Sequence, residues 1–229
     1  MTTFADLSVS DTYLKALEEL GIVNPTEIQI KAIPFLIAKR TDFIGQAQTG
    51  TGKTAAFGLP ILHAIDPDDS HIQALILSPT RELGQQIAKQ LFKFTKYGPK
   101  KIFIESVYGG ARIDQQISAL RRPTHILVAT PGRLVDLLEK KAIDLSYIKT
   151  IVLDEADEML SMGFKKDLDT ILSFTAGKRY TWLFSATMPS SIKAIIKSYM
   201  SPDAMRVVIN KHDVINNDCL LYTSPSPRD

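Results

Sequence analysis

Short apolar runs recur along the chain beyond Thr41, and a segment long enough for a helix separates each run from the next. The runs are continuous rather than alternating, and several are rich in Ile and Val, which is typical of strands buried on both faces. The pattern therefore predicts an α/β domain: a doubly wound, mainly parallel sheet of about seven strands with helices on both faces. The predicted strands are Asp42–Gly45, Ala74–Leu77, Ile102–Val107, Ile126–Val128, Ile151–Leu153, Tyr180–Phe184 and Arg206–Ile209.

Two helices are predicted before the first strand. Leucines at helical spacing over Ser10–Leu20, with Gly21 after them as a stop signal, predict a short amphipathic helix. A second helix is expected after Thr26, which suits an N-cap, because an apolar stripe runs from Ile28 to Leu36. Gln29 would lie in the first turn of that helix.

Composition narrows the class of protein. The chain has 229 residues, 45% hydrophobic and 23% charged, which suffices for a packed core in one large domain or two small ones. Its apolar runs are short and residues 1–20 mix charges throughout, so neither a membrane segment nor a signal peptide is expected. The single cysteine, Cys219, excludes an internal disulfide framework and indicates a reducing cytoplasm. The four histidines lack zinc-ligand spacing, and a net charge of +2 does not by itself indicate nucleic-acid binding.

Polar residues follow the predicted strands, one group after each of the first six. In a doubly wound sheet, ligands bind beyond the carboxyl ends of the strands, so these groups should gather at one edge. That edge is where chemistry is expected. The groups are Ala47–Thr54, Ser78–Arg81, Tyr108–Gly110, Thr130–Arg133, Asp154–Asp157 and Ser185–Thr187.

The first group has the form of a phosphate-binding loop. Residues 47–54 read Ala-Gln-Thr-Gly-Thr-Gly-Lys-Thr and precede a helical stretch that reaches about Ile65. Glycines let backbone N–H groups approach phosphate oxygens, Lys53 can neutralise them, and the Thr54 hydroxyl can reach Mg²⁺. The general pattern begins with Gly, where this chain has Ala47. An ordinary glycine-rich turn would explain the glycines but not the Lys-Thr pair at this offset.

Two acidic residues directly follow the fifth predicted strand. Asp154 stands where a nucleotide-bound Mg²⁺ needs a carboxylate, and Glu155 could orient or deprotonate an attacking water. Alternatively, two acids after a strand can cap a helix and interact with its dipole. Together with the phosphate loop, they predict phosphoryl transfer to water.

Residues Asp154–Asp157 spell Asp-Glu-Ala-Asp, and the chain resembles the DEAD-box ATP-dependent RNA helicases in an ordered set of motifs. Residues 47–54 resemble the family's Walker A motif, whose spelling includes Ala47. Pro25–Gln29 resembles the adenine-reading Q motif. The other resembling segments are Pro79–Leu83 (motif Ia), Gly109–Gly110 (the double glycine), Thr130–Arg133 (motif Ib) and Ser185–Thr187 (motif III).

The resemblance implies that ATP and Mg²⁺ bind at the sheet edge. Gln29 would read the adenine edge and Phe4 would stack on the ring, although an aromatic residue near a terminus also suits a surface or staple position. Thr54 and Asp154 would hold Mg²⁺, partly through water. The implied catalytic set is Lys53, Asp154 and Glu155, and the implied nucleotide-binding set is Phe4, Gln29, Gln48, Thr49, Gly50, Thr51, Gly52, Lys53 and Thr54.

The resemblance also implies an RNA surface and a link from it to the ATP site. Asp157, Ser185 and Thr187 would form that link, although Ser-Ala-Thr could instead be a turn that caps the next helix. Contacts to the RNA backbone would be sequence-tolerant and salt-sensitive, whereas either arginine could instead form a surface ion pair. The implied RNA-binding residues are Pro79, Thr80, Arg81, Gly109, Gly110, Thr130, Pro131, Gly132 and Arg133.

The resemblance covers only the family's first RecA-like P-loop domain, which we place at residues 1–210 with the Q motif included. The second RecA-like domain, which supplies arginine fingers, is expected to be missing because no His-Arg-x-Gly-Arg pattern occurs. Residues 211–229 would be the start of a linker and a non-native tail, since their Ser-Pro-rich end shows no periodicity.

The predicted function is an ATP-dependent RNA helicase, an RNA-dependent ATPase that couples ATP binding and hydrolysis to RNA clamping and local unwinding. The chain alone is expected to be weakly active or inactive. One alternative is an ATP-gated RNA-binding or docking module without unwinding activity, and another is a DNA-dependent ATPase. The expected partner is RNA and the expected location cytoplasmic. Neither a membrane partner nor an oligomer is predicted.

Overall fold

A parallel sheet of seven strands forms the centre of the computed structural model, which describes residues 2–39, 41–175 and 179–209. The strand order is β3-β4-β2-β5-β6-β1-β7, and every neighbouring pair is parallel. This arrangement confirms the predicted doubly wound sheet. The strands are β1 (Phe43–Gln46), β2 (Ala74–Leu77), β3 (Ile104–Val107), β4 (Ile126–Ala129), β5 (Thr150–Leu153), β6 (Tyr180–Ser185) and β7 (Met205–Val208).

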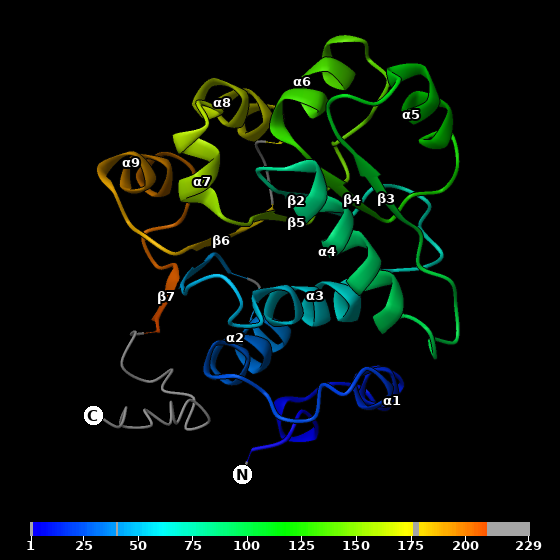
Figure 1. Cartoon of the computed structure of the whole chain (residues 1–229), viewed down its shortest axis with the longest axis vertical. Coiled ribbons are helices and arrows are strands. Elements are labelled where there is room, and N and C mark those ends of the chain that lie inside the picture. The colour runs from blue at the N-terminus through cyan, green and yellow to red at the C-terminus, as the bar shows by residue number, and fades with distance from the viewer. Residues whose placement is uncertain (1, 40, 176–178, 210–229) are drawn as a thin grey trace, which may run out of the picture.

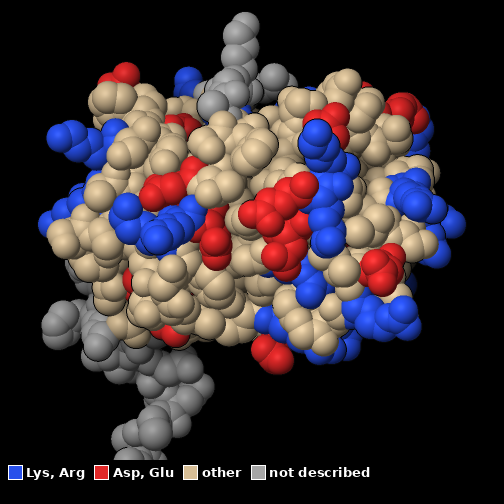
Figure 2. Space-filling model, turned by 90° about the horizontal axis from the view of Figure 1, so that it is seen from above, with Lys and Arg blue, Asp and Glu red and all other residues tan. Residues whose placement is uncertain are grey.

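Helices cover both faces of the sheet, as Figure 1 shows. On one face lie η1 (Ala5–Leu7), α1 (Asp11–Glu19), α2 (Glu27–Ala38), α3 (Lys53–Ala64) and α4 (Arg81–Phe94). On the other face lie α5 (Ile113–Ala119), α6 (Pro131–Glu139), α7 (Ala156–Ser161), α8 (Lys165–Phe174) and α9 (Ser190–Tyr199). Seen from above, the surface over α5, α6 and α8 carries Lys and Arg side chains interspersed with Asp and Glu (Figure 2).

The continuous apolar runs follow from this covering, because successive strand residues point to opposite faces. In β2, Ile76 joins the core cluster under α1–α4, whereas Leu75 and Leu77 join the cluster under α5–α9. All three side chains are completely buried. A strand that is covered on both sides must be apolar at every position, which is the pattern that predicted it.

Some element bounds differ from the prediction. Strand β3 begins at Ile104 rather than Ile102, because the backbone N–H of Phe103 donates to the ring of His125 instead of joining the ladder. Strand β7 is assigned to Met205–Val208, although the N–H of Ile209 still donates to the Gln46 carbonyl at 2.8 Å. The first helix, α1, lies within the predicted range with Ser10 at its N-cap.

None of the helices within the described residues is long and apolar enough to cross a bilayer. The predicted linker and tail at 211–229 lie outside the described residues.

Candidate functional site

The glycine-rich loop leaves β1 and enters α3 at the carboxyl edge of the sheet. The N–H of Ala47 donates to the carbonyl of Ser185 at 3.0 Å, which ties the start of the loop to the end of β6. Gly50 and Gly52 have φ angles of +79° and +84°, a region that side chains with a Cβ rarely occupy. Gly52 is the N-cap of α3, so the free N–H groups of that helix face the loop. The loop therefore has the backbone form of an anion cradle.

Lys53 lies inside this loop with only 6% of its surface exposed. Its Nζ donates to the Ala47 carbonyl at 3.4 Å and lies 4.0 Å from Oδ1 of Asp154. The loop after β1 and the turn after β5 thus meet through a buried ion pair. Because a buried ammonium group is costly unless it has anionic partners, this position favours phosphate binding.

Asp154 is 2% exposed at the end of β5. Burial raises its pKa to about 6, although the nearby Lys53 acts in the opposite direction. The Oδ1 atom accepts a hydrogen bond from the N–H of Glu155 at 3.1 Å. A buried carboxylate beside a single cation is a group that a divalent ion would stabilise.

Glu155 has an unusual backbone with φ 52° and ψ 50°, the left-handed conformation. It is the N-cap residue of α7 but forms no capping hydrogen bond with its side chain. The side chain of Glu155 therefore does not cap the helix, although its position at the N-terminus of α7 suits the interaction with the helix dipole. Strained non-glycine residues gather at functional sites, and this half-buried carboxylate stays available for a water molecule.

Gln29 contacts the loop directly. Its Nε2 donates to the carbonyl of Gly52 at 3.0 Å, and its Oε1 accepts from the N–H of Thr26 at 2.9 Å. The Thr26 hydroxyl donates to the carbonyl of Thr51 at 2.8 Å. The start of α2 is thereby clamped onto the phosphate loop. This contact of Thr26 was not predicted from the sequence, where the residue was expected only as a helix cap.

The side chains of Asp157 and Thr187 join α7 to the segment after β6. Oδ2 of Asp157 accepts from both the N–H and the hydroxyl of Thr187, at 2.9 and 2.7 Å. These bonds outweigh the effect of burial, so the pKa of Asp157 lies below its usual value. Ser185 donates to the Thr187 carbonyl at 2.7 Å. The capping alternative is wrong for this segment, because α9 has Pro189 at its N-cap.

Phe4 is 4% exposed and packs in the core cluster under α1–α4. Its burial anchors the N-terminal segment beside α2, which excludes a surface position. Little of the ring is open to a base, and stacking on adenine stays a prediction.

Arg81 and Tyr108 form one corner of the predicted RNA surface. The Arg81 guanidinium lies over the Tyr108 ring, 4.6 Å from its centroid, and Gln85 donates to the Tyr108 hydroxyl at 2.8 Å. Arg81 is exposed at the first turn of α4. Its charge stays accessible to a phosphate group while the ring restricts its orientation.

Arg133 has a different environment. Its Nη1 donates to Oε1 of Gln116 at 2.9 Å, its Nη2 to the Ala111 carbonyl at 3.1 Å, and its Nε to Asp136 at 3.4 Å. Gln116 in turn donates to the Tyr108 carbonyl at 3.1 Å. Arg133 therefore fixes the double-glycine loop through its bonds to Ala111 and Gln116. Sequence reasoning missed Gln116, although a polar residue within the apolar stripe of α5 was a usable signal.

The remaining predicted RNA residues lie at strand ends of the same edge. Thr80 is the N-cap of α4, where its Oγ1 accepts from the N–H of Leu83 at 3.3 Å. Thr130 and Pro131 begin α6. The two exposed loop glycines follow β3, and Gly110 has a φ of +80°. The other residues of the set are Pro79, which is buried, and Gly132, which is half-buried.

The outer part of the phosphate loop is open to solvent. Gln48 and Thr49 are exposed, and the Thr51 hydroxyl donates to the Gln48 carbonyl at 2.7 Å. Thr54 is half-buried in the first turn of α3. The sheet edge thus brings together a cation, a carboxylate, a hydroxyl and free helix N–H groups.

The sequence and the fold of this chain are similar to those of known proteins. The DEAD/DEAH box helicase family matches residues 26–195. The DEAD-box ATP-dependent RNA helicase CshA of Geobacillus kaustophilus is 44% identical over 217 residues, 94% of this chain and 46% of the relative. The RNA helicase CrhR of Synechocystis is 48% identical over 207 residues, 90% of this chain and 41% of the relative. The chain spans less than half the length of these curated relatives.

Solved structures give the same picture. A DEAD box protein from the hyperthermophile Methanococcus jannaschii superposes with a TM-score of 0.86 at 39% identity, covering 92% of this chain and 56% of that one. The yeast DEAD-box splicing factor Prp28 superposes with a TM-score of 0.78 at 36% identity, covering 84% of this chain and 48% of that one.

Proposed function

Because the chain belongs to the DEAD/DEAH box helicase family, we propose that it is the nucleotide-binding part of an ATP-dependent RNA helicase. In the whole protein, ATP binding and hydrolysis would drive RNA clamping and local duplex unwinding. The observation that carries this proposal is the buried pair of Lys53 and Asp154, which joins the phosphate loop to the Asp-Glu-Ala-Asp turn.

The residues present fit a nucleotide with Mg²⁺. The buried Lys53 ammonium and the N–H groups at the start of α3 suit phosphate oxygens. The Thr54 hydroxyl and the Asp154 carboxylate would hold Mg²⁺, partly through water. The raised pKa of Asp154 supports this role, because a divalent cation would stabilise its ionised form. When bound, ATP would supply the γ-phosphoryl group that passes to water, and Mg²⁺ would neutralise charge on the phosphate oxygens.

Glu155 is the residue proposed to act on that water. Its carboxylate would orient the water and accept its proton, while Lys53 neutralises the charge on the phosphate oxygens. Gln29 would read the adenine edge with the same amide that holds the phosphate loop. Reading the base would then be coupled to the geometry of the loop.

The hydrogen bonds between Asp157 and Thr187 support a link from this site to the RNA surface. Arg81, with the backbone around Gly109, Gly110 and Gly132, would contact RNA phosphates without reading bases. A second RecA-like domain would complete the site. The proposed location of the protein is the cytoplasm.

RNA-stimulated ATP hydrolysis by the chain joined to a second RecA-like domain tests the proposal. Single-stranded RNA should stimulate hydrolysis strongly, and the chain alone should be slower by about 10³–10⁵-fold, the usual contribution of an arginine finger. Absence of stimulation would favour a binding module without unwinding activity. Equal stimulation by single-stranded DNA would favour a DNA-dependent ATPase.

A further inference from the structure

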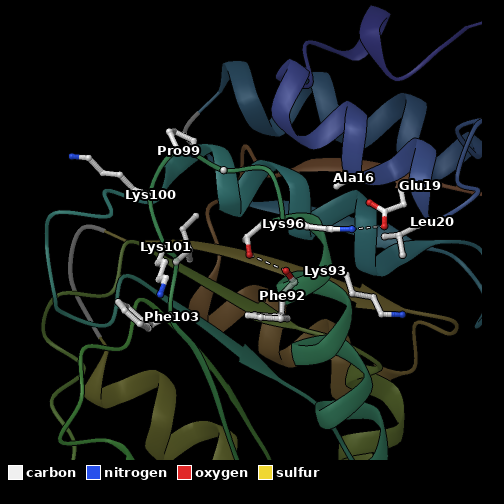
Figure 3. A pocket seen from close by; sticks show the side chains of 13 residues that line it. Ala16, Glu19, Leu20, Phe92, Lys93, Lys96, Pro99, Lys100, Lys101 and Phe103 are labelled. Atoms are coloured by element: carbon white, nitrogen blue, oxygen red, sulfur yellow. Dashed lines mark hydrogen bonds and ion pairs between the residues drawn. The ribbon is translucent and has the colours of Figure 1, made fainter.

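A groove of about 960 Å³ lies far from the residues assigned above, between the end of α1, the last turns of α4 and the loop that leads into β3 (Figure 3). That loop precedes a strand, so it lies at the amino edge of the sheet. The proposed nucleotide and RNA contacts from the loop after β1 onward follow strands, so they lie at the carboxyl edge. The proposed helicase site therefore leaves this groove unused.

Apolar side chains form the floor of the groove. Ala16 and Leu20 come from the α1 side, and Ile102 from the loop before β3. Two large aromatic residues at its border are unusually open to solvent: Phe92 is 67% exposed and Phe103 is 44% exposed. Tyr97, which lies between them in the sequence but does not line the groove, is 42% exposed. Such a concentration of exposed aromatic residues marks a binding surface rather than an ordinary solvated one.

The rim of the groove is strongly basic. Lys93, Lys96, Lys100 and Lys101 line it against one acidic residue, Glu19. This local excess is larger than the net charge of +2 of the whole chain. It also differs from the surface over α5, α6 and α8, where charges of both signs are interspersed (Figure 2).

Two of these lysines have their charge unpaired within the described part of the chain. Lys96 reaches across the groove to Glu19, and Lys100 pairs with Asp68, but Lys93 and Lys101 form no ion pair with any described residue. Figure 3 shows the side chains of Lys93 and Lys101 on opposite sides of the groove. Free ammonium groups on both sides of an apolar floor suit a ligand that carries separated negative charges.

The basic surface continues along α4. A second hollow of about 360 Å³ shares Leu20 and Lys93 with the groove and adds Gln86, Lys89 and Gln90 from the same helix. Residues spaced three and four apart lie on one face of a helix. The two hollows together form an elongated surface, which fits an extended or helical polypeptide segment better than a compact small molecule.

We propose that this surface, which we call the lysine-rimmed groove, docks an acidic polypeptide segment with apolar anchor residues. The anchors would lie on the floor beside Phe92 and Phe103, and the carboxylates would pair with Lys93 and Lys101. A single-stranded nucleic acid would match the lysine rim and could stack bases on Phe92 and Phe103, but it has no aliphatic side chain to bury on the floor. A second copy of the chain in a symmetric dimer would bring two lysine rims together, which is unfavourable.

A random-peptide display selection on the 1–229 chain tests this proposal, with the variant Lys93→Glu/Lys101→Glu used for counter-selection. The expected peptides combine Asp or Glu with Trp, Phe or Leu. One enriched peptide, labelled with fluorescein, is then titrated by anisotropy. The charge-reversal variant and Phe92→Ala should each weaken binding by about tenfold or more. Because Phe92 is 67% exposed, its removal should leave the fold intact.

The matched control is Lys193→Glu/Lys197→Glu, which reverses two exposed charges on α9 and should leave peptide affinity unchanged. The proposal would be overturned if the enriched peptides did not combine acidic and apolar residues. It would also be overturned if the control variant lost as much peptide affinity as the groove variants. A labelled oligouridine that binds the chain and is released by the groove variants would assign the groove to nucleic acid instead. Dimerisation that Phe92→Ala abolishes would assign it to self-association.

Discussion

Gln29 holds the phosphate loop through one hydrogen bond, from its Nε2 to the carbonyl oxygen of Gly52 at 3.0 Å. The same amide accepts the N–H of Thr26, so both of its ends are engaged within the chain. Gln29 is 3% exposed, and such a buried amide depends on these partners. A nucleotide base that pairs with this amide would therefore compete with, or rearrange, the contact that shapes the loop.

We expect Gln29→Ala to have two effects. Loss of base contacts should abolish the preference for ATP over GTP. Loss of the hydrogen bond to the Gly52 carbonyl should lower the affinity for both nucleotides by about tenfold. Titration of fluorescent ATP and GTP analogues measures both. The control Thr26→Val removes the hydroxyl bond to the Thr51 carbonyl and the capping-box bond from the Gln29 N–H, but it keeps the Gln29 amide. It should therefore lower both affinities while keeping the preference. A retained preference in Gln29→Ala would point to another residue as the base reader.

Gly52→Ala should disrupt the same contact from the other side. A Cβ at Gly52 would lie 2.3 Å from Nε2 of Gln29, and the φ of +84° adds backbone strain of about 1–2 kcal/mol. At Gly50 the φ is +79° but no atom lies within 4 Å of an added Cβ, so Gly50→Ala introduces the strain alone. Urea unfolding should show the larger loss for Gly52→Ala. Adding Gln29→Ala should recover part of it, and equal losses in the two glycine variants would contradict the clash.

The sheet and the phosphate loop could be predicted from the sequence because their signals are local. An apolar run such as Ala74–Leu77 identifies a strand that is buried on both faces, and the Lys-Thr pair at 53–54 identifies the phosphate loop. Neither signal requires knowledge of contacts with distant residues. Parallel pairing then brings the strand ends to one edge, where Lys53 and Asp154 were expected to gather and where they form their buried pair.

Contacts between side chains far apart in the chain could not be predicted in this way. The bond from Gln29 to Gly52 spans 23 residues, and the bond from Arg133 to Gln116 spans 17. Neither follows from periodicity, because one depends on how α2 packs on the phosphate loop and the other on how α5 packs against α6. Arg133 was expected as a free cation for RNA, yet its guanidinium donates to three groups of the chain.

Glu155→Gln should separate binding from turnover. The substitution keeps the size of the side chain and the left-handed backbone at φ 52°, so it removes the charge alone. In the chain joined to its second domain, ATP affinity should be unchanged and hydrolysis should fall by about 10²–10⁴-fold. Single-turnover hydrolysis of radiolabelled ATP measures this. Hydrolysis at the unaltered rate would exclude Glu155 as the residue that acts on water.

The two arginines of the RNA surface should differ in salt dependence. Arg81 is exposed, so Arg81→Gln should weaken RNA binding and reduce the slope of log K against log salt by about one phosphate contact. Arg133→Lys keeps the charge but loses the fork that holds Gln116 and Ala111, so it should weaken binding without changing the slope. Anisotropy of labelled RNA over a salt series tests both. Equal slopes for the two variants would contradict separate roles.

His125 should make the stability of the domain depend on pH. The side chain is 1% exposed, and its Nδ1 accepts the N–H of Phe103 at 3.0 Å, which only a neutral ring nitrogen can do. Burial lowers its pKa below the ordinary value of 6.5. As pH falls below 6.5, the unfolded chain binds a proton before the folded one does. The contribution of His125 to stability is therefore complete above that pH and declines below it.

Urea unfolding at several pH values checks this. The quantity compared is the free energy of unfolding of the unaltered chain and of His125→Asn. Asn offers an acceptor oxygen near the position of Nδ1 but does not titrate, so the variant should lose stability less steeply below pH 6.5. The difference in slope is at most about 1.4 kcal/mol per pH unit for one proton. His63→Asn, at an exposed position in the last turn of α3, serves as the control. Parallel curves for the unaltered chain and His125→Asn would show that His125 does not carry the pH dependence.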